Sequence, residues 1–103
     1  MYSESMTFRV EKLPSAEVEI SALEQSQQTI LQSEYEIIET KGIEFVRVRH
    51  LQDKIFEIKS HELRSLFIYQ PERIILVGVV FVKKTDKTPK EKIKLAKQRL
   101  KGV

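Results

Sequence analysis

The 103-residue sequence contains no cysteine and only three glycines and three prolines. Without cysteine, the chain can form neither disulfide bonds nor thiolate metal sites, and its redox compartment cannot be inferred from this residue. Residues 1–10 lack the apolar run of a signal peptide or membrane span, so we expect a cytoplasmic protein with no membrane partner. The absence of repeats and of Pro/Gly-rich linkers predicts a single domain over residues 1–103.

Positive charge is scarce in the first part of the chain. Residues 1–40 hold two basic and eight acidic residues, a net charge of −6, whereas residues 41–103 hold sixteen basic and seven acidic residues, a net charge of +9. Only the second part is therefore a candidate surface for a polyanion. The alternative is a solvated lysine-rich face that serves solubility alone. The positions of the charges in the fold distinguish these two interpretations.

The hydrophobic pattern predicts helices first and strands afterwards. Residues 7–10 alternate as a short strand that ends before Pro14, and Ser15 can cap a helix. Residues 15–41 have the spacing of one broken helix or a helical hairpin, which Gly42 ends with a positive φ angle. Four segments rich in Val, Ile and Phe then predict strands, at residues 45–51, 55–59, 63–69 and 74–82.

The links between these strands are short, which requires antiparallel neighbours. Residues 74–82 are apolar on both faces and predict the central strand, in which Gly78 indicates a bend or bulge. Thr88, Pro89 and Glu91 predict a capping box at the start of a basic amphipathic helix. The element order predicts an α+β fold, with two N-terminal helices and a C-terminal helix on one side of a twisted, mainly antiparallel sheet.

Motifs for metal-dependent or nucleophilic hydrolysis are missing. The sequence has no HExxH, GxSxG or P-loop pattern, and its two histidines, His50 and His61, fall near different strand ends. We therefore expect neither a metal site nor a cofactor.

Cationic side chains near the predicted strand ends are the candidates for chemistry. Arg64 lies within an apolar strand, where a guanidinium must be paired or line a cleft; an internal salt bridge with Glu57 or Glu62 is as good an explanation as a functional role. We expect adjacent strand ends to gather the candidate catalytic residues, which are Lys59, His61, Arg64, Lys83 and Lys84. A solvated strand end for the two lysines and an exposed turn position for the histidine are the simpler alternatives.

Such a cluster suits RNA cleavage without a metal ion. The 2′-hydroxyl attacks the adjacent phosphate, and arginine can hold the phosphate and stabilise the charge that develops on it. A base must take the 2′ proton and an acid must protonate the leaving 5′ oxygen. Lysine can serve if like-charged neighbours lower its pKa, and the ordinary pKa of histidine suits either role.

The sequence at these positions resembles the phage-derived HigB-like branch of the RelE/ParE toxin superfamily. The resemblance covers about residues 45–100 and is carried by residues 55–59, 63–69 and 79–85, then by Thr88-Pro89 with Ile93 and Ala96. It implies a microbial-RNase-like sheet and a toxin that cleaves mRNA on the ribosome. It also implies an antitoxin partner, often with a helix-turn-helix, that holds the toxin inactive.

By motif position, Arg64 matches the strand arginine that contacts the scissile phosphate in this family, and Lys84 the basic residue after the central strand. Lys59 stands where many relatives have arginine. The tyrosine or histidine that several relatives use for proton transfer has no counterpart, because neither residue type occurs after Lys84.

The basic C-terminal helix is the expected contact with ribosomal RNA. The candidate RNA-binding residues are Arg73, Lys87, Lys90, Lys94 and Lys97. Two alternatives stay open: a toxin of the same fold that inhibits a protein such as gyrase, and a non-catalytic phage-derived module that binds RNA or protein.

Overall fold

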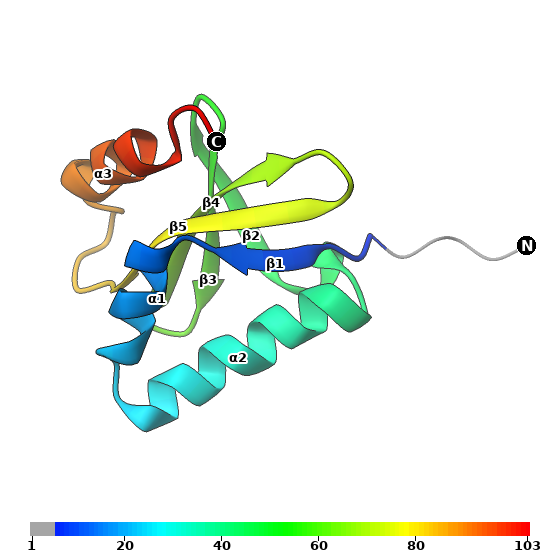
Figure 1. The fold of residues 1–103 in the computed structure, drawn as a ribbon. Coiled ribbons are helices and arrows are strands. Elements are labelled where there is room, and N and C mark those ends of the chain that lie inside the picture. Colours follow the sequence, from blue (N-terminus) through cyan, green and yellow to red (C-terminus); the bar gives the residue numbers. More distant parts are fainter. Residues whose placement is uncertain (1–5) are drawn as a thin grey trace, which may run out of the picture.

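The computed structural model describes residues 6–103 as a five-stranded sheet with helices on both faces (Figure 1). The elements in chain order are β1 (Arg9–Lys12), α1 (Pro14–Ser21), α2 (Gln25–Thr40), the short 3-10 helix η1 (Ile43–Phe45), β2 (Arg47–Gln52), β3 (Ile55–Ser60), β4 (Leu63–Gln70), β5 (Ile74–Val82) and α3 (Lys90–Leu100). The strand order is β1-β5-β4-β3-β2, and β1 is parallel to β5 while the other pairs are antiparallel. This confirms the predicted α+β fold class.

The N-terminal helical region forms two separate helices. Pro14 occupies the first turn of α1, where its fixed φ and missing N–H fit, so the cap is Leu13 and not Ser15 as the sequence suggested. A capping box formed by Glu24 and Gln27 starts α2. Gly42 follows α2 with a φ of 133°, as expected. None of the helices within residues 6–103 is long and apolar enough to cross a membrane.

The two faces of the sheet carry different helices. One core joins α1 and α2 to the sheet and includes Leu31, Ile38 and Phe67, all buried. The other core joins α3 to the opposite face, where Ile93 and Leu100 pack with buried residues of β4 and β5. The expectation that all helices share one side is therefore wrong. The physical reason is that β5 is apolar on both faces and needs a covering layer on each.

A β-bulge in β5 confirms the expectation from Gly78. Leu66 pairs with Val79 and Phe67 pairs with Val77, so Gly78 is the extra residue. A Cβ at Gly78 would lie 2.7 Å from Cγ of Leu100, so glycine permits the close approach of α3. β5 is interior and buried as predicted, but β4 is the middle strand because β1 adds outside β5.

Candidate functional site

A row of cationic residues crosses the sheet on the face that carries α3. Arg47 pairs with Lys59 across β2 and β3, Lys59 with Arg64 across β3 and β4, and Arg64 with Phe81 across β4 and β5. Phe81 belongs to the core under α3, and paired residues share a face, so the three cations lie on that face too. Three positive charges thus stand side by side at one end of the sheet.

Lys59 is the centre of this arrangement. It is partly buried, and this partial loss of water lowers its pKa below the usual lysine value. The nearby charges of Arg49 and Lys83 lower the pKa further, and Arg64 acts in the same direction. Glu57 opposes them. We call Arg49, Lys59, Arg64 and Lys83 the cationic cluster.

Arg64 is held by backbone carbonyls. Its Nη1 donates to the carbonyl oxygens of His61 at 2.6 Å and of Leu63 at 2.8 Å, while its buried Nε has no hydrogen-bond partner. Within residues 6–103, Arg64 forms no ion pair, so the salt bridge with Glu57 or Glu62 considered from the sequence is absent there. The Nη2 side of the guanidinium therefore stays available for a phosphate.

The buried Glu57 has other partners. Its Oε2 accepts a hydrogen bond from Oγ1 of Thr88, and its Oε1 lies 3.4 Å from Nη2 of Arg49. Because the Thr88 hydroxyl is used in this way, the predicted capping box at Thr88, Pro89 and Glu91 is wrong. Pro89 takes the cap position of α3 without a side-chain hydrogen bond.

The two remaining catalytic candidates lie differently. Lys84 is exposed in the segment after β5 and is not among the charges that act on Lys59. His61 occupies the β3–β4 turn with a φ of 59°, and its charged neighbours are Glu34 of α2 and Glu62. The structure thus brings Lys59, Arg64 and Lys83 together, and it leaves His61 exposed in the turn, where its charge acts on Glu34 and Glu62.

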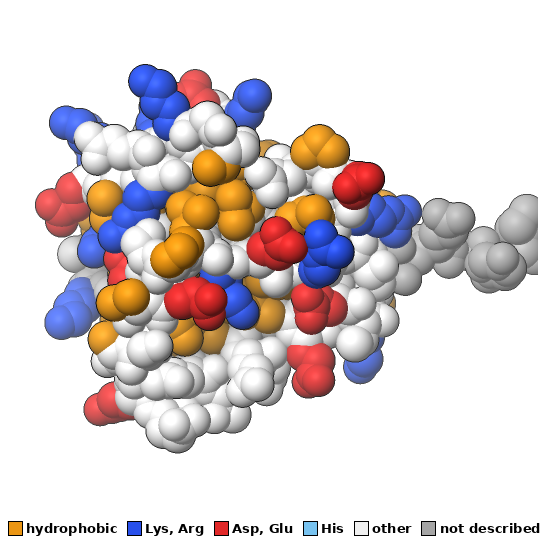
Figure 2. Space-filling model, viewed as in Figure 1, with side chains coloured by type: hydrophobic (Ala, Val, Ile, Leu, Met, Phe, Trp, Pro, Cys, Tyr) orange, Lys and Arg blue, Asp and Glu red, His pale blue; other side chains and the backbone are white. Residues whose placement is uncertain are grey.

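The five RNA-binding candidates do not form one surface. Arg73 precedes β5 and Lys83 follows it, so nine strand residues, about 30 Å, separate them. Lys97 is paired with Asp53 at 2.6 Å. The other three, Lys87, Lys90 and Lys94, are exposed. In Figure 2, blue side chains surround α3 at the upper left, and acidic and basic side chains are mixed over β1 and α2.

Three cations at this site were missed from the sequence, and Arg47, which lies opposite Lys59, is the first. Arg49 is part of the cationic cluster, and Nζ of Lys92 in α3 lies 5.4 Å from the ring centroid of Phe81, the strand neighbour of Arg64. The alternation of Arg47, Val48 and Arg49 in a predicted strand was a usable signal, because it puts both arginines on one face. The position of Lys92 depends on the placement of α3, which the sequence pattern predicted on the wrong face of the sheet.

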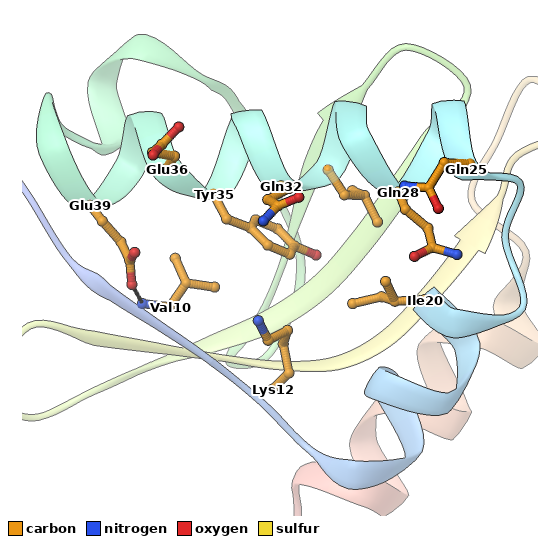
Figure 3. Close-up of a pocket in the computed structure, with 10 residues that line it drawn as sticks. Val10, Lys12, Ile20, Gln25, Gln28, Gln32, Tyr35, Glu36 and Glu39 are labelled. Carbon is orange, nitrogen blue, oxygen red and sulfur yellow. Dashed lines mark hydrogen bonds between the residues drawn. The ribbon is translucent and has the colours of Figure 1, made fainter.

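Two of the surface hollows are candidates for the place where a polyanion could bind. One of about 430 Å³ borders β2 and is lined by Arg47, Arg49 and Lys59, with two valines. Another, of about 420 Å³, lies between β1, α1 and α2, where Lys12 points to the ring of Tyr35 and Glu39 accepts from the backbone N–H of Val10 (Figure 3). The second hollow also contains Glu36 and is poorly suited to a polyanion.

Within residues 6–103, no three His, Cys, Asp or Glu side chains come together in a way that could hold a metal ion.

The fold is that of the RelE toxins. A chain of the archaeal RelE–RelB complex from Pyrococcus horikoshii OT3 matches with a TM-score of 0.63 and 14% sequence identity, over 76% of this chain and 97% of that one. The isolated E. coli RelE toxin matches with a TM-score of 0.57 and 20% identity, over 85% of this chain and 97% of that one.

The sequence assigns the family. Residues 18–101 match the family described as phage derived protein Gp49-like (DUF891), and the chain belongs to this family. The match includes every residue of the cationic cluster. No protein of curated function matches the sequence significantly.

Proposed function

We propose that the chain is the toxin of a toxin–antitoxin pair and cleaves mRNA on the ribosome without a metal ion. Residues 1–103 act as one domain in this proposal, in the cytoplasm where ribosomes are found. The observation that carries it is the convergence of Arg49, Arg64 and Lys83 around Lys59, with no carboxylate paired to Arg64 within residues 6–103. The RelE-like fold and the phage-derived family support it.

The cluster has the groups that this reaction needs. Arg64 binds the scissile phosphate through its available Nη2 side and stabilises the charge that builds on the phosphoryl oxygens. Lys59, whose pKa is lowered, takes the proton as the 2′ oxygen bonds to phosphorus. As the bond from phosphorus to the 5′ oxygen breaks, Lys83 donates a proton to that oxygen, and Lys84 contacts a flanking phosphate.

The antitoxin is the proposed partner. The archaeal structure with the same fold was solved as a RelE–RelB complex, which supports a protein partner for this chain as well. A helix-turn-helix antitoxin of the HigB-like type is the expected form. The product of a neighbouring reading frame should co-purify with this chain and prevent growth arrest when the two are expressed together.

Primer extension on transcripts after induced expression tests the activity. We expect new 5′ ends within translated regions, and cleavage by the purified protein only when ribosomes are present. Arg64→Ala should lower the cleavage rate about 100-fold or more, as the loss of a transition-state donor does elsewhere. Arg9→Ala is the matched control, because Arg9 is exposed and pairs with Glu11 on β1.

Other results would contradict the proposal. Growth arrest with intact transcripts and loss of supercoiling would identify a gyrase inhibitor. Co-purified, uncut RNA would identify a binding module. The missing tyrosine or histidine after Lys84 favours either of these two alternatives over the nuclease. Equal cleavage by Arg64→Ala and Arg9→Ala would remove Arg64 from the site.

A further inference from the structure

Glu57 is a carboxylate that the proposed chemistry does not use. It is 0% exposed in the middle of β3, so it cannot contact a substrate. Burying a carboxylate costs free energy unless charge pairing and hydrogen bonds compensate. Its position on the face of the cationic cluster therefore needs an explanation beyond packing.

Glu57, Arg49 opposite it on β2, and Thr88 from the segment before α3 form a closed triangle. Thr88 donates its hydroxyl hydrogen to Oε2 of Glu57, and Nη2 of Arg49 donates to Oγ1 of Thr88 at 3.2 Å. The same Nη2 lies 3.4 Å from Oε1 of Glu57. The triangle joins β2, β3 and the segment before α3. Each member has another member as its partner, so one substitution should disturb all three.

The start of α3 indicates that the hydrogen bond from Thr88 to Glu57 is preferred over a helix cap. Threonine before a proline is well placed to cap a helix, and losing a cap costs about 1 kcal/mol. Thr88 gives its hydroxyl to Glu57 instead, and α3 begins without a side-chain cap. The segment preceding α3 is thereby fixed to the sheet beside the cationic cluster.

Arg49 is the exposed corner of the triangle. Its side chain is 47% exposed, while that of Glu57 is fully buried. One nitrogen is held by Thr88, which orients the guanidinium plane and lowers the entropy lost when the other nitrogens bind a ligand. Arg49 also faces the hollow shared with Arg47 and Lys59.

We infer that Arg49 binds an RNA phosphate beside the scissile one, and that Glu57 and Thr88 are positioning residues that orient it. This inference rests on the proposed function, because the phosphate belongs to the RNA bound at the cationic cluster. Arg47 cannot substitute for Arg49 here, because the contacts of the triangle are made by Arg49.

A double-mutant cycle tests the inference. Arg49→Ala and Thr88→Val are each expected to raise KM for ribosome-bound mRNA about tenfold, the loss of one charge-assisted hydrogen bond, with kcat at a pH above the midpoint of the pH profile changed less than threefold. The double variant should be no worse than Arg49→Ala alone, because Thr88 acts through Arg49. Thr88→Ser keeps the hydroxyl and should restore KM.

Controls separate positioning from general destabilisation. Thr85→Val removes a hydroxyl that bonds only to the carbonyl of Lys87 among residues 6–103, and it should leave KM unchanged. Ile93→Val loosens the packing of α3 and should lower the melting temperature without raising KM. Arg49→Ala should also raise the midpoint of the pH profile, because Arg49 lowers the pKa of Lys59, whereas Thr88→Val keeps the charge of Arg49 and should shift the midpoint less.

Binding of an uncleavable RNA keeps the two proposals distinguishable. With 2′-O-methyl RNA, wild type should bind about tenfold more tightly than Arg49→Ala. Binding without cleavage by the wild type would remove the proposed function and leave the inference standing. Cleavage with unchanged KM and affinity in an Arg49→Ala variant whose cooperative thermal melt shows that it is folded would overturn the inference alone. Additive effects in the cycle would overturn the positioning role of Thr88.

Discussion

The environment of Arg64 depends on strand register, which the sequence alone does not reveal. The sequence allowed Arg64 to pair with Glu57 or Glu62 as well as to line a site. In the structure Arg64 is opposite Lys59, while Glu57 is opposite Leu66. A shift of β3 by two residues would have put Glu57 opposite Arg64. Whether Arg64 faces a lysine or a carboxylate therefore depends on the strand register, which the length of the β3–β4 turn sets and the sequence pattern leaves uncertain.

Tyr35 and Ser65 provide a buried hydrogen bond that can be tested by substitution. Their hydroxyl oxygens are 2.6 Å apart in the core between α2 and β4. Tyr35→Phe should lower the free energy of unfolding by about 1–2 kcal/mol, because the hydroxyl of Ser65 is left buried without a partner. Denaturant unfolding measures the change, and adding Ser65→Ala should recover part of it. Tyr69→Phe is the control, since Tyr69 is 40% exposed; an equal loss there would contradict the explanation.

Glu34 predicts a pH dependence of stability. Partial burial raises its pKa above the usual value of 4.5, and the nearby Ser60 hydroxyl and His61 oppose the rise. A carboxyl with a raised pKa in the folded state favours folding when protonated, and this contribution is lost as the pH rises from about 4.5 through the folded-state pKa. Glu34→Gln should therefore be more stable than wild type at pH 7, and the difference should vanish near pH 3. Melting temperatures of Glu34→Gln and wild type at both pH values measure this difference. The control is Glu36→Gln, because Glu36 is exposed.

The strands were the most predictable elements. Expected strands at residues 55–59, 63–69 and 74–82 correspond to β3, β4 and β5 with ends that differ by at most one residue. Runs of β-branched and aromatic residues between short polar turns define them without reference to the rest of the fold. The cationic cluster follows in part from these strand ends, and for that reason Lys59, Arg64 and Lys83 were identified together.

Tertiary contacts determined what the sequence pattern missed. Thr88 has the local signature of a helix cap, but a buried carboxylate on β3 competes for its hydroxyl and is the stronger acceptor. The side of the sheet that α3 covers was also missed, although a strand with two apolar faces needs a layer on each side. The proximity of His61 to Glu34 of α2 was missed as well, because it joins segments that are far apart in the sequence. None of these outcomes depends on neighbouring residues in the sequence.

The bulge in β5 makes Gly78 a sensitive position for the docking of α3. A methyl group there would meet three carbon atoms of Leu100 at 2.7 to 3.0 Å. Gly78→Ala should destabilise the protein by about 1–3 kcal/mol, the usual cost of overpacking a core. If the clash is the cause, Leu100→Ala in the same chain should cost less than it does alone. Urea unfolding of the four proteins measures this, and independent effects would point to the backbone of the bulge instead.

At the scale of the whole molecule, charge divides along the chain and across the sheet. Residues 6–40 hold two basic and seven acidic residues, a net charge of −5, and they form β1 and the layer of α1 and α2, while the net charge of +9 falls on residues 41–103. Under the proposed function, this distribution would steer RNA to the face of α3 and the cationic cluster, away from the layer of α1 and α2. The fold thus separates a basic side from an acidic side.

Salt dependence of RNA binding tests this division. Lys90 and Lys94 are exposed on α3. One phosphate contact to a single strand contributes about 0.7 to the slope of log affinity against log salt concentration. If each lysine neutralises one phosphate, replacing both with alanine should reduce this slope by about 1.4. The matched control replaces Arg9 and Lys41, two cations from the β1 and α2 side, and should leave the slope unchanged. Fluorescence anisotropy with 2′-O-methyl RNA between 50 and 200 mM salt, roughly the range in which such slopes are measured, gives both values. The salt slope reports how many phosphates the protein neutralises, because each bound phosphate releases counterions. Equal slopes for the two double variants would therefore contradict a preference of RNA for the α3 side.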